Sequence, residues 1–331
     1  MAELPEWARF FGSQERLDRF EAAVLKDMED RGIRVAIENG WVWPMEGSGR
    51  EGGDRWGLSN IGQRCAQEDE GEWAGLLERH FDSIFETQLE TQELDFADFD
   101  SLRTRLSVRL WEAEALGDSH VCARDDIPGL RTCLCVDLER GIRGLTPGEA
   151  AQLGRPLEEL FALAIENAIE ASEVELQRVE FEPDPGESDS ASGAGESGGD
   201  GAGENPAAIA LTGDSPYISS HILRMDRYAA HLGAHGAIVA VPLRDVVVIL
   251  PFEDAGVIGV MPKLMLMAAR MYADGPGSVT ASVYWYQGQE GGKSWTEIPY
   301  ELSEQNLDIM PPPELIERLE SLLGGAGEEG E

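Results

Sequence analysis

AIVAVPLRDVVVILPF, residues 237–252, is the most apolar and β-branched stretch of this chain. Residues 237–241 and 246–250 each have the composition of a β-strand. Between them lie four residues that include Pro242 and Asp245, which are typical of turns. Residues 246–250 are all apolar, so we expect both faces of this strand to be covered, as in the centre of a sheet. The stretch therefore predicts a buried β-hairpin inside an α+β domain.

Predicted strands and helices alternate on both sides of this hairpin. The strands are expected at residues 129–138, 174–181, 207–211, 279–286 and 294–300. The helices are expected after Thr146, at residues 156–172, from Ser215-Pro216 to Gly233, and at residues 255–272 and 313–323. We predict that residues 117–323 form one α+β domain, with a mixed or antiparallel sheet and packed helices.

Residues 1–116 are predicted to form a smaller α+β unit of their own. Its helices are expected at residues 14–31, 59–66, 72–89 and 96–105, and a strand at 106–111. Asn39-Gly40 lies between two short apolar runs, and both turn residues tolerate a positive φ. This dipeptide therefore predicts a second hairpin.

The segment at residues 182–206 is acidic and rich in glycine and serine, with no aromatic or large aliphatic side chain. Such a composition cannot offset the entropy of ordering, so we expect a disordered insert there and a disordered tail at 324–331. The predicted strands before and after the insert are too short to be stable without sheet neighbours. We therefore place the insert inside one domain, as an enlarged hairpin loop.

Acidic residues dominate the charge. The chain has 63 Asp and Glu against 26 Lys and Arg, a formal net charge of −37. Nucleic-acid binding through phosphates needs a basic surface, and anionic membranes repel an acidic one, so both partners are excluded. Three explanations of the acidity stay open: a salt-rich cytoplasm, genomic base composition, and mimicry of a nucleic acid toward a basic protein.

The sequence also indicates a compartment. The N-terminus MAELPEWARF lacks the apolar core of a signal peptide, and no apolar run reaches the length of a membrane span. We expect a cytoplasmic protein with four reduced cysteines, namely Cys65, Cys122, Cys133 and Cys135.

The sequence contains a few matches to motifs of binding or catalytic sites, but the context of each match argues against such a site. Gly193, Gly195 and Gly198 match the dinucleotide pattern, but they lie in the acidic insert rather than between a strand and a helix. His231 and His235 have the spacing of a helical metal pair, but a glycine separates them and no third ligand is evident. Cys133 and Cys135, with Cys122 nearby, are interpreted as buried apolar side chains. We predict no catalytic, cofactor-binding or metal-binding residue.

Two charged turns remain as candidate contacts for a ligand or a partner. Asp137, Arg140 and Arg143 follow a predicted buried strand, and Arg244-Asp245 forms the turn of the central hairpin. The simpler explanation of each turn is a solvated surface turn, because surface ion pairs are common and weak.

Several short motifs follow one another in a recognisable order. They are LSNIGQRCAQ at 58–67, EWAGLLERHFDSI at 72–84, PGL at 128–130, the strand ending in Asp137, Arg143, Thr146, EELF at 158–161, EN at 166–167, the helix and strand pair of 215–252, SVYWYQGQ at 282–289 and Trp295. This order resembles the YtpQ-like family of uncharacterised bacterial proteins, a domain of unknown function. The resemblance implies the fold and a cytoplasmic location, and it assigns no catalytic residue. The long acidic insert departs from the family pattern.

These observations favour a non-catalytic binding or regulatory module, with a protein as its partner. The alternative is an enzyme whose site is assembled from dispersed acidic and arginine residues, which spacing along the chain cannot reveal. A deep pocket with convergent acids favours the enzyme, and a flat apolar patch favours partner binding. The sequence leaves the oligomeric state open.

Overall fold

The computed structural model describes residues 4–45, 55–116, 120–181, 207–288, 294–303 and 306–325. Helices pack on several small sheets, and every strand pair in the described ranges is antiparallel. The predicted α+β class is therefore confirmed. In the described part of the chain, no helix is both long enough and apolar enough to cross a membrane.

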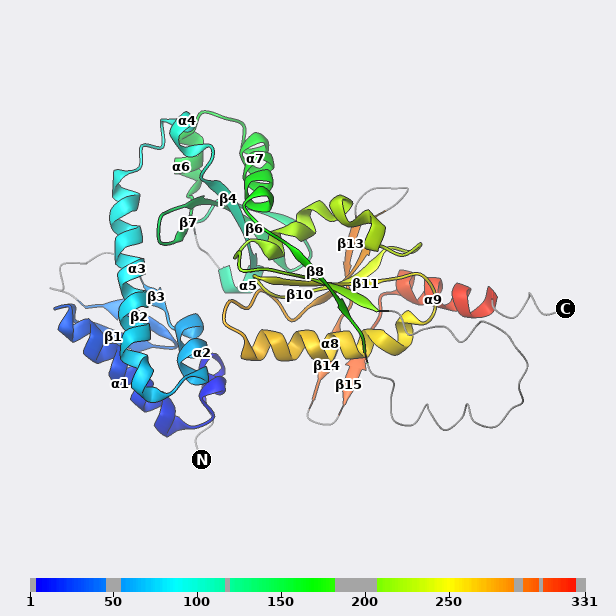
Figure 1. Cartoon of the computed structure of the whole chain (residues 1–331), viewed down its shortest axis with the longest axis horizontal. Helices are drawn as coiled ribbons and strands as arrows, with labels where there is room; N and C mark the ends of the chain where they lie inside the picture. Colours follow the sequence, from blue (N-terminus) through cyan, green and yellow to red (C-terminus); the bar gives the residue numbers. More distant parts are fainter. Residues whose placement is uncertain are drawn as a thin grey trace.

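The N-terminal unit packs helices against a three-stranded sheet (Figure 1). Its helices are η1 (Glu6–Phe11), α1 (Gln14–Asp30), α2 (Ser59–Gln67), η2 (Glu70–Glu72) and α3 (Trp73–Glu93). Its strands are β1 (Val35–Glu38), β2 (Trp41–Pro44) and β3 (Trp56–Gly57). The predicted turn joins β1 to β2, with φ of 49° at Asn39 and 76° at Gly40. Both residues thus have the positive φ that this turn requires.

A second sheet, in the order β4-β6-β5, has the short strand β7 beside β6. Its strands are β4 (Leu106–Glu112), β5 (Ala123–Ile127), β6 (Leu130–Asp137) and β7 (Ile142–Gly144). The helices around it are α4 (Phe99–Leu102), α5 (Ala113–Leu116), α6 (Pro147–Gln152) and α7 (Leu157–Glu170). Because β4 pairs with β6 along its whole length, the unit boundary predicted at residue 117 divides one sheet, and β4 belongs with the second unit.

The largest sheet has the order β13-β12-β10-β11-β9-β8. Its strands are β8 (Glu175–Val179), β9 (Ala208–Thr212), β10 (Ala237–Leu243), β11 (Val246–Pro251), β12 (Val283–Gln287) and β13 (Ser294–Glu297). The remaining elements are η3 (Ile218–His231), α8 (Val257–Asp274), the hairpin of β14 (Tyr300–Leu302) and β15 (Leu307–Ile309), and α9 (Pro313–Gly325).

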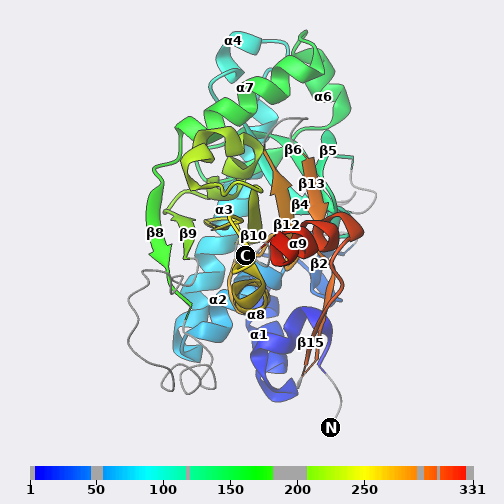
Figure 2. The same cartoon turned by 90° about the vertical axis from the view of Figure 1, so that its right-hand side faces the viewer.

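The hairpin predicted at residues 237–252 is the β10–β11 pair at the centre of this sheet. Residues 247–250 are at most 1% exposed, so both faces of β11 are covered as expected. Helix α8 packs on one face and η3 on the other (Figures 1 and 2). The register shifts between Ala240 and Leu243, next to Pro242, which cannot donate a ladder hydrogen bond.

The segment η3 differs from the regular helix that we predicted from Ser215-Pro216 to Gly233. It is a 3₁₀ helix with non-helical backbone angles at Arg224 and Tyr228. A single apolar stripe does not describe it, because Ser219, Ser220 and His221 are buried in addition to its apolar side chains. The segment contacts β4, β9, β11 and α7, so more than one of its faces is covered.

Two other helices differ in length from the prediction. The helix predicted at 96–105 is only the single turn α4. It starts late because Asp95 accepts a hydrogen bond from the Ala97 N–H ahead of it, and Asp98 caps its start by accepting from the Ser101 N–H. Such local bonds compete with a continuing helix. At the C-terminus, α9 continues to Gly325, beyond the predicted start of the tail at residue 324.

Strands β8 and β9 pair antiparallel, with Val179 opposite Ala208. The sequence predicted this pairing from the strands on each side of the acidic insert. The insert itself, residues 182–206, lies outside the described residues. Because its flanking strands are neighbours in one sheet, a short connection is long enough to join them.

We therefore expect that a Gly-Asn-Gly turn in place of residues 184–205 leaves a folded protein with unchanged or slightly higher stability. Loop-closure entropy changes by only about 0.6 kcal/mol for each doubling of loop length. Urea unfolding of the shortened chain measures this. A chain with a neutral Gly/Ser/Asn segment of the original length separates the effect of length from that of charge. A loss of well over 1 kcal/mol in the shortened chain contradicts the prediction.

Candidate functional site

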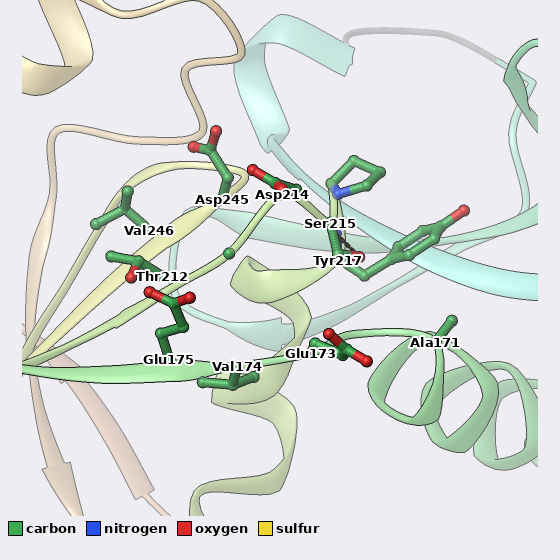
Figure 3. A pocket seen from close by; sticks show the side chains of 12 residues that line it. Ala171, Glu173, Val174, Glu175, Thr212, Asp214, Ser215, Tyr217, Asp245 and Val246 are labelled. Atoms are coloured by element: carbon green, nitrogen blue, oxygen red, sulfur yellow. Dashed lines mark hydrogen bonds between the residues drawn. The ribbon is translucent and has the colours of Figure 1, made fainter.

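A hollow of about 870 Å³ lies at the end of the six-stranded sheet, beside the turn of the central hairpin (Figure 3). Three chain segments form its wall: the start of β8, the connection from β9 to η3, and the β10–β11 turn. The lining residues are Ala171, Glu173, Val174, Glu175, Thr212, Gly213, Asp214, Ser215, Pro216, Tyr217, Asp245 and Val246.

The strand register brings these segments together. Thr212 is opposite Glu175 on one side and opposite Val246 on the other, so three strands reach the hollow at the same level. Gly213 then lets the chain pass close to β8, because a Cβ there would lie 2.5 Å from the backbone oxygen of Glu173. A side chain at position 213 would push the two segments apart and change the shape of the hollow.

Carboxylates dominate the charge of this lining. Glu173, Glu175, Asp214 and Asp245 all belong to it, and none of the lining residues, all of them in the described part of the chain, is Lys or Arg. In Figure 3, Glu173 and Glu175 come from the start of β8, Asp214 from the connection after β9, and Asp245 from the hairpin turn. The Oδ1 atom of Asp245 is buried and has no hydrogen-bond partner among the described residues. A buried carboxylate oxygen without a partner is costly, and a cationic donor would relieve that cost.

Tyr217 connects this hollow to the second sheet. The residue lines the hollow, and its hydroxyl donates a hydrogen bond to the carboxylate of Asp137 at the end of β6. The same carboxylate accepts a hydrogen bond of 2.9 Å from Ser107 on β4. Burial, followed by the hydrogen bond to Asp137, raises the pKa of Tyr217 well above its ordinary value. The tyrosine therefore stays protonated and holds one wall of the hollow against β6.

Arg140 and Arg143, predicted with Asp137 as ligand contacts, are paired with acidic side chains of the chain itself. Arg140 forms a 2.8 Å ion pair with Glu86 on α3. Arg143 donates two hydrogen bonds to Glu149, which also closes the capping box of α6. The Arg143 and Thr146 hydrogen bonds keep the pKa of Glu149 below its ordinary value although burial opposes them.

Arg244 and Asp245 lie on opposite sides of the hairpin turn. Asp245 lines the hollow, whereas the Arg244 side chain lies against Gly277, in the loop after α8. That loop also contacts the N-terminal unit, because the Gly277 N–H donates a 3.0 Å hydrogen bond to Asn60 on α2. The five predicted contact residues are therefore not assembled in one site, and only Asp245 reaches the hollow.

Sequence reasoning missed most of this lining. Glu175 belongs to an ordinary alternating strand pattern, Glu173 lies just before that strand, and Asp214 is one more acid before an expected helix. The available signal was the run Gly213-Asp214-Ser215-Pro216, a turn placed between a strand and a helix. Turns of this kind often carry binding residues, because a rigid scaffold positions them.

Other predicted candidates can now be placed. His231 ends η3 and His235 lies beyond it, stacked edge-on against Phe252, so the two are not one helical turn apart on a single helix. Cys133 and Cys135 are fully buried, and burial raises the pKa of Cys133 to about 12. In the described ranges, no three His, Cys, Asp or Glu residues are arranged to hold a metal ion.

Comparisons with family models, with curated proteins and with solved structures found no match to this chain. The resemblance to the YtpQ-like family stays a prediction.

Proposed function

We propose that this protein is a non-catalytic binding module that holds a basic side chain of a partner protein in the acidic hollow beside Asp245. The observation that carries the proposal is the ring of four carboxylates, one of which has a buried oxygen without a partner among the described residues. Guanidinium and ammonium groups are the donors that carboxylates bind most strongly, and Asp245 as a whole residue is only partly buried.

The shape of the lining supports a lysine or arginine side chain as the bound group. Val174, Pro216 and Val246 give the hollow an apolar part beside its carboxylates. Long basic side chains pack their methylene stems on apolar surface and keep the charged end among polar groups. The lining thus complements both parts of such a side chain.

The exposure of the acids supports a partner that approaches from solvent. Glu173, Glu175 and Asp214 are exposed, while Asp245 is partly buried. The exposed carboxylates attract a cation over a distance, and the chain as a whole adds a net charge of −37 to that attraction. The inner carboxylate then distinguishes a side chain that enters the hollow from one that stays at the surface.

Calorimetric titration with an arginine peptide, Gly-Arg-Gly-Arg-Gly, tests this proposal at physiological salt. The neutral peptide with citrulline in place of arginine is the ligand control. The triple variant Glu173→Gln, Glu175→Gln, Asp214→Asn is expected to bind the arginine peptide at least tenfold more weakly, because each exposed acid contributes attraction at the rim.

A matched variant on α9, Glu314→Gln, Glu317→Gln, Glu320→Gln, removes the same charge far along the chain and is expected to bind within twofold of the natural protein. Equal weakening in both triple variants means that only net charge attracts the peptide, and the proposal fails. Binding of spermine with no binding of the peptide also overturns it, because the ligand is then a small polycation.

A further inference from the structure

Two arginines stand out in a chain whose acids outnumber its bases by 63 to 26. Many of the described arginines form ion pairs with these acids. Arg109 and Arg244 form none within the described residues, and neither guanidinium donates a hydrogen bond there. Each guanidinium has five N–H donors in a planar fork, so two strong donor groups are left without an acceptor in the described part of the chain.

Arg109 is held in a partly buried place on β4. It is opposite Cys133 on β6, and the next residue back, Val108, accepts a 3.2 Å hydrogen bond from Ser220 on η3. Its guanidinium carbon is 5.6 Å from the centre of the Trp111 ring, a contact that uses the ring face and no N–H donor. Desolvation and the nearby charge of Arg244 both lower the pKa of Arg109.

Arg244 is fixed on the other side of the same junction. Its backbone N–H donates to the Gly277 oxygen at 3.0 Å, and its backbone oxygen accepts from the Ser219 N–H at 2.8 Å. The side chain then runs along Gly277, where a Cβ would lie 2.8 Å from its Nε. Consecutive residues of η3, Ser219 and Ser220, thus bond to Arg244 and to Val108 beside Arg109, so both arginines belong to one junction, where the charge of Arg244 acts on Arg109.

Two neighbouring cations without an anion between them are unfavourable. The negative charge of Asp137 opposes the lowering of the Arg109 pKa. The Asp137 carboxylate accepts hydrogen bonds from Tyr217 and Ser107, however, and none from Arg109. Both arginine residues are partly rather than fully buried. A bound oxyanion accepts from both forks and removes the repulsion.

We propose that Arg109 and Arg244 together bind an oxyanion, namely inorganic phosphate or the phosphoryl group of a small molecule. A tetrahedral dianion matches two guanidinium groups in charge and offers acceptors in two directions, whereas a carboxylate offers one charge and one plane. This site is separate from the acidic hollow and does not depend on the function proposed for that hollow.

Calorimetric titration with inorganic phosphate and with phenyl phosphate tests the site, at constant ionic strength set by potassium chloride. The constant ionic strength matters because an acidic surface responds to any added salt. We expect saturable binding of at least one probe, and at least a tenfold loss of affinity in Arg109→Gln and in Arg244→Gln. Tighter binding of the ester identifies a phosphorylated molecule as the ligand class, and tighter binding of phosphate identifies the free anion.

Arg318→Gln, which removes an exposed arginine of α9, is the matched control and is expected to leave the affinity unchanged. Arg244→Gln is the deciding variant should Arg109→Gln unfold, because Arg244 lies on a turn and circular dichroism verifies its fold. No binding of either probe at 10 mM, a concentration about 10–100 times a Kd of about 0.1–1 mM, overturns the proposal. Equal affinity in Arg244→Gln and the natural protein overturns it as well.

Discussion

Replacement of Gly236 by alanine is expected to destabilise the protein by about 4 kcal/mol or more, which places it among the most damaging single substitutions. Gly236 has a φ of +89°, and a Cβ on it would lie 1.9 Å from the backbone oxygen of Tyr286. A left-handed backbone costs a non-glycine residue about 1–2 kcal/mol by itself. The contact between the added Cβ and the Tyr286 backbone increases this cost further, because β12 cannot move away without breaking its pairing with β10.

The position of Gly236 explains why the effect is so large. Its backbone N–H donates to Gly233, and its oxygen accepts from both Gly233 and Phe252. These bonds start β10, which pairs with β11 on one side and β12 on the other. A shift at this residue therefore disturbs the two central ladders of the sheet together.

Urea unfolding of Gly236→Ala and of Gly154→Ala measures the two contributions separately. Gly154 also has a positive φ, +65°, but a Cβ added there would have no atom within 4 Å. The control is therefore expected to lose only the conformational cost of about 1–2 kcal/mol. Similar losses in both variants show that β12 yields to the added methyl group, contrary to the expected result.

The parts of the fold that the sequence predicted are those fixed by neighbouring residues. The central hairpin follows from apolar runs on both sides of a turn, and the Asn39-Gly40 turn needs two residues with positive φ. The helix expected after Thr146 begins there, and Thr146 and Glu149 form its capping box. In each case the deciding interactions span only a few residues, so the pattern is visible in the sequence.

The candidate sites depend on contacts between distant segments, which a single sequence does not reveal. Arg109 interrupts an apolar strand, and the simplest interpretation of such a residue is exposure to solvent. The structure places η3, more than 100 residues later in the chain, against this strand, as the bond from Ser220 to the Val108 carbonyl shows. The link from Tyr217 to Asp137 spans 80 residues. The pattern of charges along the sequence therefore does not reveal that these groups are neighbours in the fold.

The stability of the protein is expected to fall by about 3 kcal/mol between pH 6.5 and pH 4 through His221 alone. This histidine is 3% exposed, and its Nδ1 is 2.5 Å from the Tyr228 hydroxyl. Its Nε2 is buried and has no partner among the described residues. Burial, followed by the charge of Arg227, lowers the pKa of His221 from 6.5 to about 4.

The direction follows from the two protonation states. Well above pH 6.5 the histidine is neutral in the folded and unfolded chains, so its contribution is fully present. Between pH 6.5 and about 4 the unfolded chain binds a proton that the folded chain does not, and stability falls as pH falls. A pKa difference of this size corresponds to about 3 kcal/mol at 1.36 kcal/mol for each unit. Below about pH 4 both states are protonated and the loss from this residue ends.

Urea unfolding at a series of pH values, for the natural chain and for His221→Gln, isolates this contribution. Glutamine cannot take up the proton, so the variant is expected to lose about 3 kcal/mol less than the natural chain over the same pH range. It also starts from a lower stability at pH 7, because the hydrogen bond with Tyr228 is lost or weakened. His80, whose pKa burial lowers to about 4, remains in both chains and cancels in the comparison.

His231→Gln, at the end of the same segment, is the control for a histidine change in η3. If His221→Gln and the natural chain lose stability in parallel from pH 6.5 to 4, the proton is not taken up at His221, and the acid sensitivity arises elsewhere.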